Sequence, residues 1–243
     1  MGSWLAVLAV AGLLSACATK VPPVAASPAE LSKIHSIAVV RPPEPKTYRL
    51  SNLNHPAGSA LSGFGPLGIL VGSAVATADM SAKQNRLNQA FKDQRLTISS
   101  DLAAKTADEL AKRGFAVRVY DGPWKEVNGE WKIEADELAS TADAVLVMVP
   151  DTVGFIANPP YVNDYAPTIW AWARLLGSDR KQVVYQGFHA VGFKPASSSW
   201  KYLSSTGGFK DFDALMVDTE AAAESLGDAA QAIAVSIAED LKR

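Results

Sequence analysis

The stretch ELAKRGFAVRVY, residues 109–120, joins the end of a helix to the strand that follows it. Apolar and small residues recur at helical spacing over residues 99–113, which predicts a helix there. Gly114 stands where a glycine commonly ends a helix. The alternating run FAVRVY is typical of a strand, and it stops at a turn sequence, residues 121–123. A helix that leads directly into a strand predicts an α/β domain.

Two further strands are predicted on either side of this unit. Residues 34–40, IHSIAVV, form a β-branched run, and the proline pair at residues 42–43 ends it. Residues 144–149, AVLVMV, are continuously apolar, as in a strand that is covered on both faces. Both runs therefore predict buried strands of one sheet.

The C-terminal third predicts the rest of the domain. Residues 168–176 and 182–192 flank a polar turn and predict a long antiparallel pair, which makes the sheet mixed. Residues 218–241 carry an apolar stripe at helical spacing and predict a long terminal helix. A small hairpin at Asn128–Gly129 and a short helix at 135–141 are also expected. The fold class is α/β: a mixed, roughly five-stranded sheet with helices packed on it, in a single domain over residues 34–243.

The N-terminus reads MGSWLAVLAVAGLLSAC. Its apolar core is too short for a membrane span of about 20 residues and has the length of a signal-peptide core. It lacks the Lys or Arg that export signals usually carry before that core. Residues 1–16 are therefore predicted to be a signal peptide. The alternative is an N-terminal helix with a buried cysteine, but the prolines at 22, 23 and 28 would prevent such a helix from continuing.

The tetrapeptide LSAC at residues 14–17 resembles the lipobox of bacterial lipoproteins. This resemblance implies that Cys17 becomes the first residue of the mature chain and carries a diacylglycerol and an N-acyl chain, such as palmitate. Ala18 follows the cysteine, which by the sorting rule of enteric bacteria implies the outer membrane. Residues 17–33 are rich in Pro, Ala and Ser and are predicted to form a flexible tether.

Residues 51–78 contain no Asp, Glu, Lys or Arg and are rich in glycine. Gly68, Gly72 and Ala76 repeat at a spacing of four, which lets helices approach closely, particularly in lipid. Prolines interrupt the segment, so a bilayer span is not favoured. Three interpretations remain open for this glycine-rich segment: packing on its own domain or a loop, contact with a membrane, and oligomerisation.

The sequence gives little support for nucleic-acid binding, catalysis or metal binding. A net charge of −2 without basic blocks disfavours nucleic acid, and the single cysteine allows no internal disulfide. The GxGxxG match at 63–68 follows no strand, and the SxxK match at Ser198 and Lys201 lacks its partner motifs. No enzyme activity, metal or cofactor is therefore expected. His35, His55 and His189 are too far apart in sequence to form a local metal site. Asp151, Asp164 and Asp179 are expected to cap turns, and no functional role is assigned to them.

Aromatic residues gather late in the chain. Residues 155–165, with Trp170 and Trp172 nearby, have a composition suited to gripping a peptide or a protein partner. The preferred interpretation of the two tryptophans is that they lie in the core of the strand pair.

The order of IAVV, ELAKRGFAVRVY, ADAVLVMV, ARLLGSDRKQVVYQG and a terminal helix resembles a group of periplasmic domains. These are the amino-terminal domain of TolB, the LpoB-type activators of penicillin-binding proteins, and the curli secretion lipoprotein. The resemblance implies a non-catalytic adaptor that binds an envelope protein in the periplasm. The alternative is a membrane-interacting or pore-forming oligomer built through residues 51–78.

Overall fold

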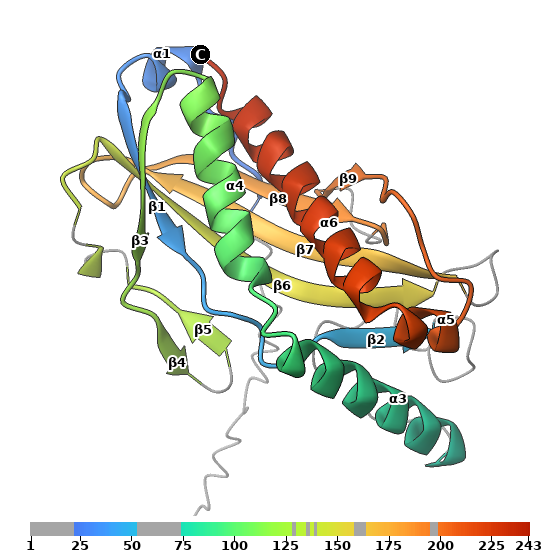
Figure 1. Cartoon of the computed structure of the whole chain (residues 1–243). Coiled ribbons are helices and arrows are strands. Elements are labelled where there is room, and N and C mark those ends of the chain that lie inside the picture. The colour runs from blue at the N-terminus through green and yellow to red at the C-terminus, as the bar shows by residue number, and fades with distance from the viewer. Residues whose placement is uncertain are drawn as a thin grey trace, which may run out of the picture.

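The computed structural model describes residues 22–52, 74–127, 130–134, 137–138, 140–157, 164–194 and 199–243. A mixed seven-stranded sheet runs in the order β3-β1-β6-β7-β8-β9, and β2 pairs with the far half of β6. Two long helices, α4 and α6, lie side by side across one face of this sheet (Figure 1). The strands are β1 (Ser36–Arg41), β2 (Arg49–Asn52), β3 (Ala116–Asp121), β6 (Ala144–Ala157), β7 (Tyr165–Leu176), β8 (Val183–Val191) and β9 (Lys201–Leu203). The helices are α1 (Pro28–Leu31), α3 (Ala74–Asp93), α4 (Ile98–Lys112), α5 (Phe212–Val217) and α6 (Thr219–Asp240).

Strand β1 lies next to the edge strand β3 and pairs in parallel with both β3 and β6. Its IAVV run is buried because both faces of the strand are covered. Successive side chains of a strand point to opposite faces. Ile37 and Val39 therefore join the large core beneath α4 and α6, whereas Ala38 and Val40 join a smaller cluster on the other face.

The second half of the sheet is antiparallel. β6, β7 and β8 form consecutive antiparallel pairs, as the two apolar runs around the polar turn predict. The apolar stripe of α6 lies over β7 and β8, and Leu226, Ile233 and Ile237 are fully buried there. The predicted fold class is thus confirmed, including the long C-terminal helix.

Several elements differ from the prediction in extent. β6 continues past Pro150 to Ala157, and the short strands β2 and β9 add to the five that were expected. The predicted hairpin is confirmed: β4 (Lys125–Val127) and β5 (Glu130–Lys132) pair antiparallel. Of residues 135–141, the structure describes 137, 138, 140 and 141, and none of these four lies in an α-helix.

Residues 22–33 pack against the domain. The backbone of Val24 exchanges two hydrogen bonds, of 2.9 and 2.8 Å, with Gln186 on β8. Ser27 caps α1, and Leu31 is fully buried in the main core. The fold therefore includes residues that the sequence assigns to the tether, and the chain meets the sheet already at Pro22.

Candidate functional site

The predicted site residues lie largely outside the described part of the chain. This holds for Cys17, Gly68 and Gly72. Ala76 falls within α3, but its side chain is among those not described. Within the described ranges, no helix is both long and apolar enough to cross a bilayer, and no three metal-binding side chains gather in one place.

Helix α3 is held against β2 by amide side chains. The backbone N–H of Leu50 donates to Gln84 Oε1 at 2.7 Å, and Gln84 Nε2 donates to the carbonyl of Tyr48. One helical turn later, Asn88 Oδ1 accepts from the N–H of Tyr48 at 2.6 Å. These amides satisfy the side of β2 that faces away from β6, where a neighbouring strand would otherwise bond.

Removal of the Gln84 side-chain amide should weaken the attachment of α3 to β2. Gln84→Ala leaves two part-buried backbone groups of residues 48 and 50 without partners, so we expect about 2 kcal/mol less stability. Urea denaturation measures the loss, and hydrogen exchange at the Leu50 amide reports it locally. Gln89→Ala is the matched control, because Gln89 bonds only to Asp93 on the exposed side of α3, and it should change stability little. Equal effects of the two variants would contradict the role assigned to Gln84.

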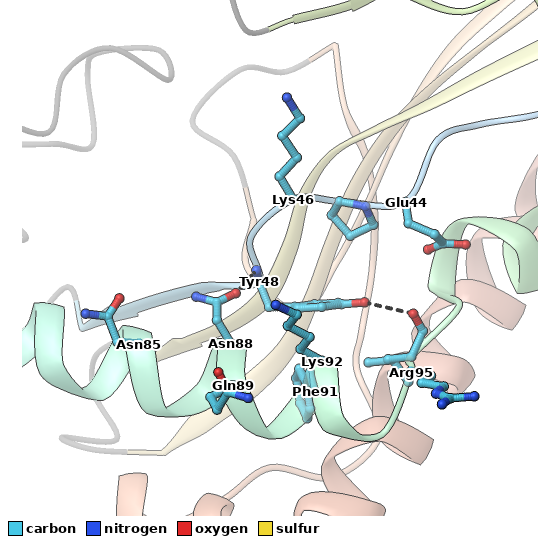
Figure 2. A pocket seen from close by; sticks show the side chains of 11 residues that line it. Glu44, Lys46, Tyr48, Asn85, Asn88, Gln89, Phe91, Lys92 and Arg95 are labelled. Atoms are coloured by element: carbon cyan, nitrogen blue, oxygen red, sulfur yellow. Dashed lines mark hydrogen bonds between the residues drawn. The ribbon is translucent and has the colours of Figure 1, made fainter.

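A cleft of about 520 Å³ lies between residues 44–48 and the C-terminal half of α3. Figure 2 shows Tyr48 at its centre, with its hydroxyl donating to the carbonyl of Leu96 at 3.3 Å. The Tyr48 ring packs edge-on against Phe91, with centroids 5.0 Å apart. The Glu44 carboxylate accepts from the N–H groups of Ser99 and Ser100, each at 2.9 Å, and so caps the N-terminus of α4.

The cleft carries positive charge and amides around a neutral phenol. Burial, and then the nearby Glu44 carboxylate, raise the pKa of Tyr48 well above its ordinary value, so the phenol stays protonated. Lys46 pairs with Glu126 at 2.5 Å. Lys92 and Arg95 line the cleft without an ion pair to any described residue. The lining is suited to bind carboxylate or hydroxyl groups of a partner, and it presents no arrangement of nucleophile and base.

A buried polar network lies between β8 and α6. Tyr185 donates its hydroxyl proton to Asp240 at 3.0 Å, so its oxygen accepts from His189 Nε2 at 2.8 Å. The other ring nitrogen of His189 lies 3.0 Å from Ser236 Oγ. Asp240 also accepts from Lys201 at 2.8 Å. His189 and Ser236 are almost fully buried and join helix to sheet. Tyr185, Lys201 and Asp240 also border a cleft of about 260 Å³ beside residues 23–26.

The sheet face opposite α4 and α6 carries aromatic side chains along β7, β8 and the residues that follow β8. We call Trp170, Trp172, Phe188, Phe193, Trp200 and Tyr202 the aromatic face. The Trp170 ring lies 5.8 Å from Phe193 and 5.6 Å from Trp200, and Phe188 lies 5.5 Å from Trp200. All six are partly exposed, and Tyr202 most of all, at 40%. The preferred interpretation of Trp170 and Trp172 as core residues holds only in part, because both are partly exposed and only Trp172 packs against the smaller buried cluster. Helices α4 and α6 cover the other face of β7 (Figure 1).

The remaining candidates have structural roles or lie outside the described residues. Asp179 accepts from the N–H groups of Lys181 and Gln182, both at 2.9 Å, as expected for an aspartate that caps a turn. These bonds, first that from Gln182, lower the pKa of Asp179. Lys201 lies in β9 and pairs with Asp240, and its SxxK partner Ser198 is not described. Asp151 lies within β6 and not in a loop.

Comparisons with known proteins give likenesses to solved structures only. No protein-family model matches the sequence, and no curated protein matches it. A dodecamer of a PelC variant from Paraburkholderia phytofirmans is 11% identical with a TM-score of 0.34, over 92% of this chain and 96% of that one. Protein XCC0632 from Xanthomonas campestris, a DUF330 protein, is 15% identical with a TM-score of 0.35, over 88% and 87%.

The lipoprotein GNA1162 from Neisseria meningitidis is 20% identical with a TM-score of 0.20, over 64% of this chain and 80% of that one. These identities and scores are too low to transfer a family or a function to this protein.

Proposed function

We propose that this protein is a lipid-anchored envelope lipoprotein that faces the periplasm and acts as a non-catalytic adaptor or assembly factor. The observation that carries the proposal is the LSAC sequence, placed directly after a short apolar run at the start of the chain. Cys17 carries the acyl chains in this proposal, and the inner leaflet of the outer membrane holds them. The folded domain follows after only a few residues, since Pro22 already contacts β8.

The cleft beside α3 is the surface that we assign to a protein partner. It combines an apolar floor, made by Leu96 and the ring of Tyr48 above the buried Phe91, with the cations Lys92 and Arg95. Such a combination fits a segment of an envelope protein that carries acidic side chains near an apolar one. Residues from two separate parts of the chain build the cleft, so a partner that binds there would also hold α3 in place.

Substitution of the lipobox cysteine tests the anchor. Cys17→Ser should abolish the mass increase of a triacylated cysteine and shift the protein out of the outer-membrane fraction, because the serine hydroxyl does not replace the thiol as acyl acceptor. Intact mass and fractionation of the wild type and the variant measure both effects. A wild-type protein that is unprocessed or found only in the soluble fraction would contradict the anchor. Ser15→Ala, which retains a small residue in the lipobox, is the matched control and should still be acylated.

The rival function is a membrane-interacting or pore-forming oligomer built through residues 51–78. Gly68, Gly72 and Ala76 favour it, because their spacing allows close helix contacts. Deletion of residues 58–76 separates the two functions. An adaptor should keep its assembly size, measured by sedimentation in detergent, whereas an oligomer built through this segment should fall apart.

A further inference from the structure

The aromatic face lies next to the point where the N-terminal chain joins the sheet. Cross-strand pairs place Arg174 opposite Gln186, Trp172 opposite Phe188, and Trp170 opposite Ala190. The alternation of strand residues puts these side chains on one face, whereas Tyr185 and His189 point to α6 on the other. Gln186 Nε2 donates to the carbonyl of Pro22 at 2.9 Å, so Pro22, the first described residue, lies on the aromatic side.

The length of the chain before Pro22 limits how far the acylated residue can lie from this face. Pro22 comes five positions after Cys17, and a fully extended chain of that length spans at most about 18 Å. Along β8, Phe188 lies about 7 Å beyond Gln186 and Ala190 about 14 Å beyond it. The bilayer that holds the acyl chains must therefore pass within a short distance of the aromatic face.

The chemistry of this face matches the boundary between lipid and water. Tryptophan and tyrosine are enriched at the headgroup level of membranes, where an apolar ring and a polar tip are both accommodated. The Trp170 indole N–H is bonded to the carbonyl of Phe193 at 3.0 Å, so this ring can enter an apolar layer without an unpaired donor. Arg174 stacks over Trp172 at 5.6 Å, and the exposed Lys194 follows Phe193, so cations flank the rings. Such cations are attracted to anionic headgroups.

We propose that the aromatic face rests on the headgroup layer of the same membrane leaflet that holds the acylated Cys17. This inference rests on the proposed lipid anchor. The anchor and the rings then bind the membrane together, because the short chain gives the face a high local concentration of lipid surface. The domain is thereby held in one orientation, with the sheet facing the bilayer and α4 and α6 facing away from it.

Quenching of tryptophan fluorescence tests this orientation. The acylated protein is reconstituted into vesicles of phosphatidylethanolamine and phosphatidylglycerol that contain a lipid with a nitroxide on its headgroup. One variant, Trp124→Phe with Trp131→Phe, keeps Trp170, Trp172 and Trp200 as the tryptophans of the mature chain. The matched variant, Trp170→Phe with Trp172→Phe and Trp200→Phe, keeps Trp124 and Trp131. Circular dichroism confirms that both variants are folded before reconstitution.

We expect quenching about twofold stronger or more in the variant that keeps the tryptophans of the aromatic face, because those rings lie beside β8, where the anchored chain joins the sheet. Trp124 packs on the same side of the sheet, but it follows β3, at the edge away from β8 and from the anchor. Equal quenching in two variants that both show the mass of acylated protein would overturn the orientation and leave the lipid anchor standing. Absence of the acyl mass would overturn the anchor and, with it, this inference.

A second copy of the chain is the competing occupant of this face. In detergent micelles, a second copy would protect the same rings from quenching by acrylamide. This protection would increase with the size of the assembly. That result, together with weak nitroxide quenching in vesicles, would also overturn the proposal.

Discussion

Replacing Gly154 by alanine is expected to lower the free energy of unfolding by about 3 kcal/mol. Gly154 lies in β6 opposite Arg49 of β2, and its φ of 153° falls in a region that residues with a side chain rarely adopt. A Cβ at this position would overlap the backbone carbonyl of Arg49, which cannot move without breaking the β2–β6 pairing. Urea denaturation should show the loss, and hydrogen exchange should show that the β2 amides open first.

Gly227→Ala is the control for this substitution. Gly227 lies within α6, and a Cβ there would meet no atom within 4 Å. Alanine favours a helix over glycine by about 1 kcal/mol, so this variant should be more stable than the wild type. If Gly154→Ala were as stable as the wild type, the close approach of β2 to β6 would be contradicted.

The stability of the domain should fall as the pH is lowered from 7 to 5, because His189 is held neutral. Burial lowers the pKa of His189 to about 4, and Lys201 acts in the same direction, whereas the Asp240 carboxylate opposes it. The unfolded chain then binds a proton near pH 6.5, well before the folded chain does, so acid favours unfolding. The expected loss between pH 7 and pH 5 is about 2 kcal/mol, and it rises to about 3 kcal/mol below pH 4.

The variant His189→Gln separates this effect from other titrations. Glutamine can still bond to Tyr185 or Ser236 but takes up no proton in this range. The free energy of unfolding of the variant, measured by urea denaturation at each pH, should therefore vary less between pH 7 and pH 5 than that of the wild type. An unchanged slope in His189→Gln would refute the assignment.

The long elements were predictable because their patterns are local. The stripe of α6, the alternation of β3 and the β-branched run of β1 are each visible within a short stretch of sequence and need no knowledge of distant residues. The predicted end of β6 was wrong, because the continuous apolar run stops at Val149 whereas the strand goes on through Pro150. The missing N–H of this proline is tolerated because β1 pairs with β6 only as far as Val147, and a bulge between Pro150 and Thr152 absorbs the irregularity.

The candidate surfaces depend on contacts between distant residues, and sequence patterns do not report these. Gln84 and Asn88 lie one turn apart on α3, a spacing that indicates a shared helix face but not a bond to the backbone of residues 48 and 50. The alternation of Trp170 and Trp172 correctly indicates one face of a strand. Which face remains uncovered depends on where α4 and α6 pack, and that is decided by the whole topology.

A contact between residues far apart in sequence joins the chain after α6 to the chain before β1, and this bears on the order in which the domain can form. The guanidinium of Arg243, the last residue, donates to the carbonyl of Ile34 just before β1 and lies 4.2 Å from the centre of the Phe115 ring. β1 itself pairs with β6, whose residues come more than a hundred positions later. β1 therefore acquires its two neighbours only after β3 and then β6 have been synthesised, and the contact of Arg243 with Ile34 forms later still. The contacts that close the core thus join residues far apart in sequence, and such contacts form more slowly than local ones.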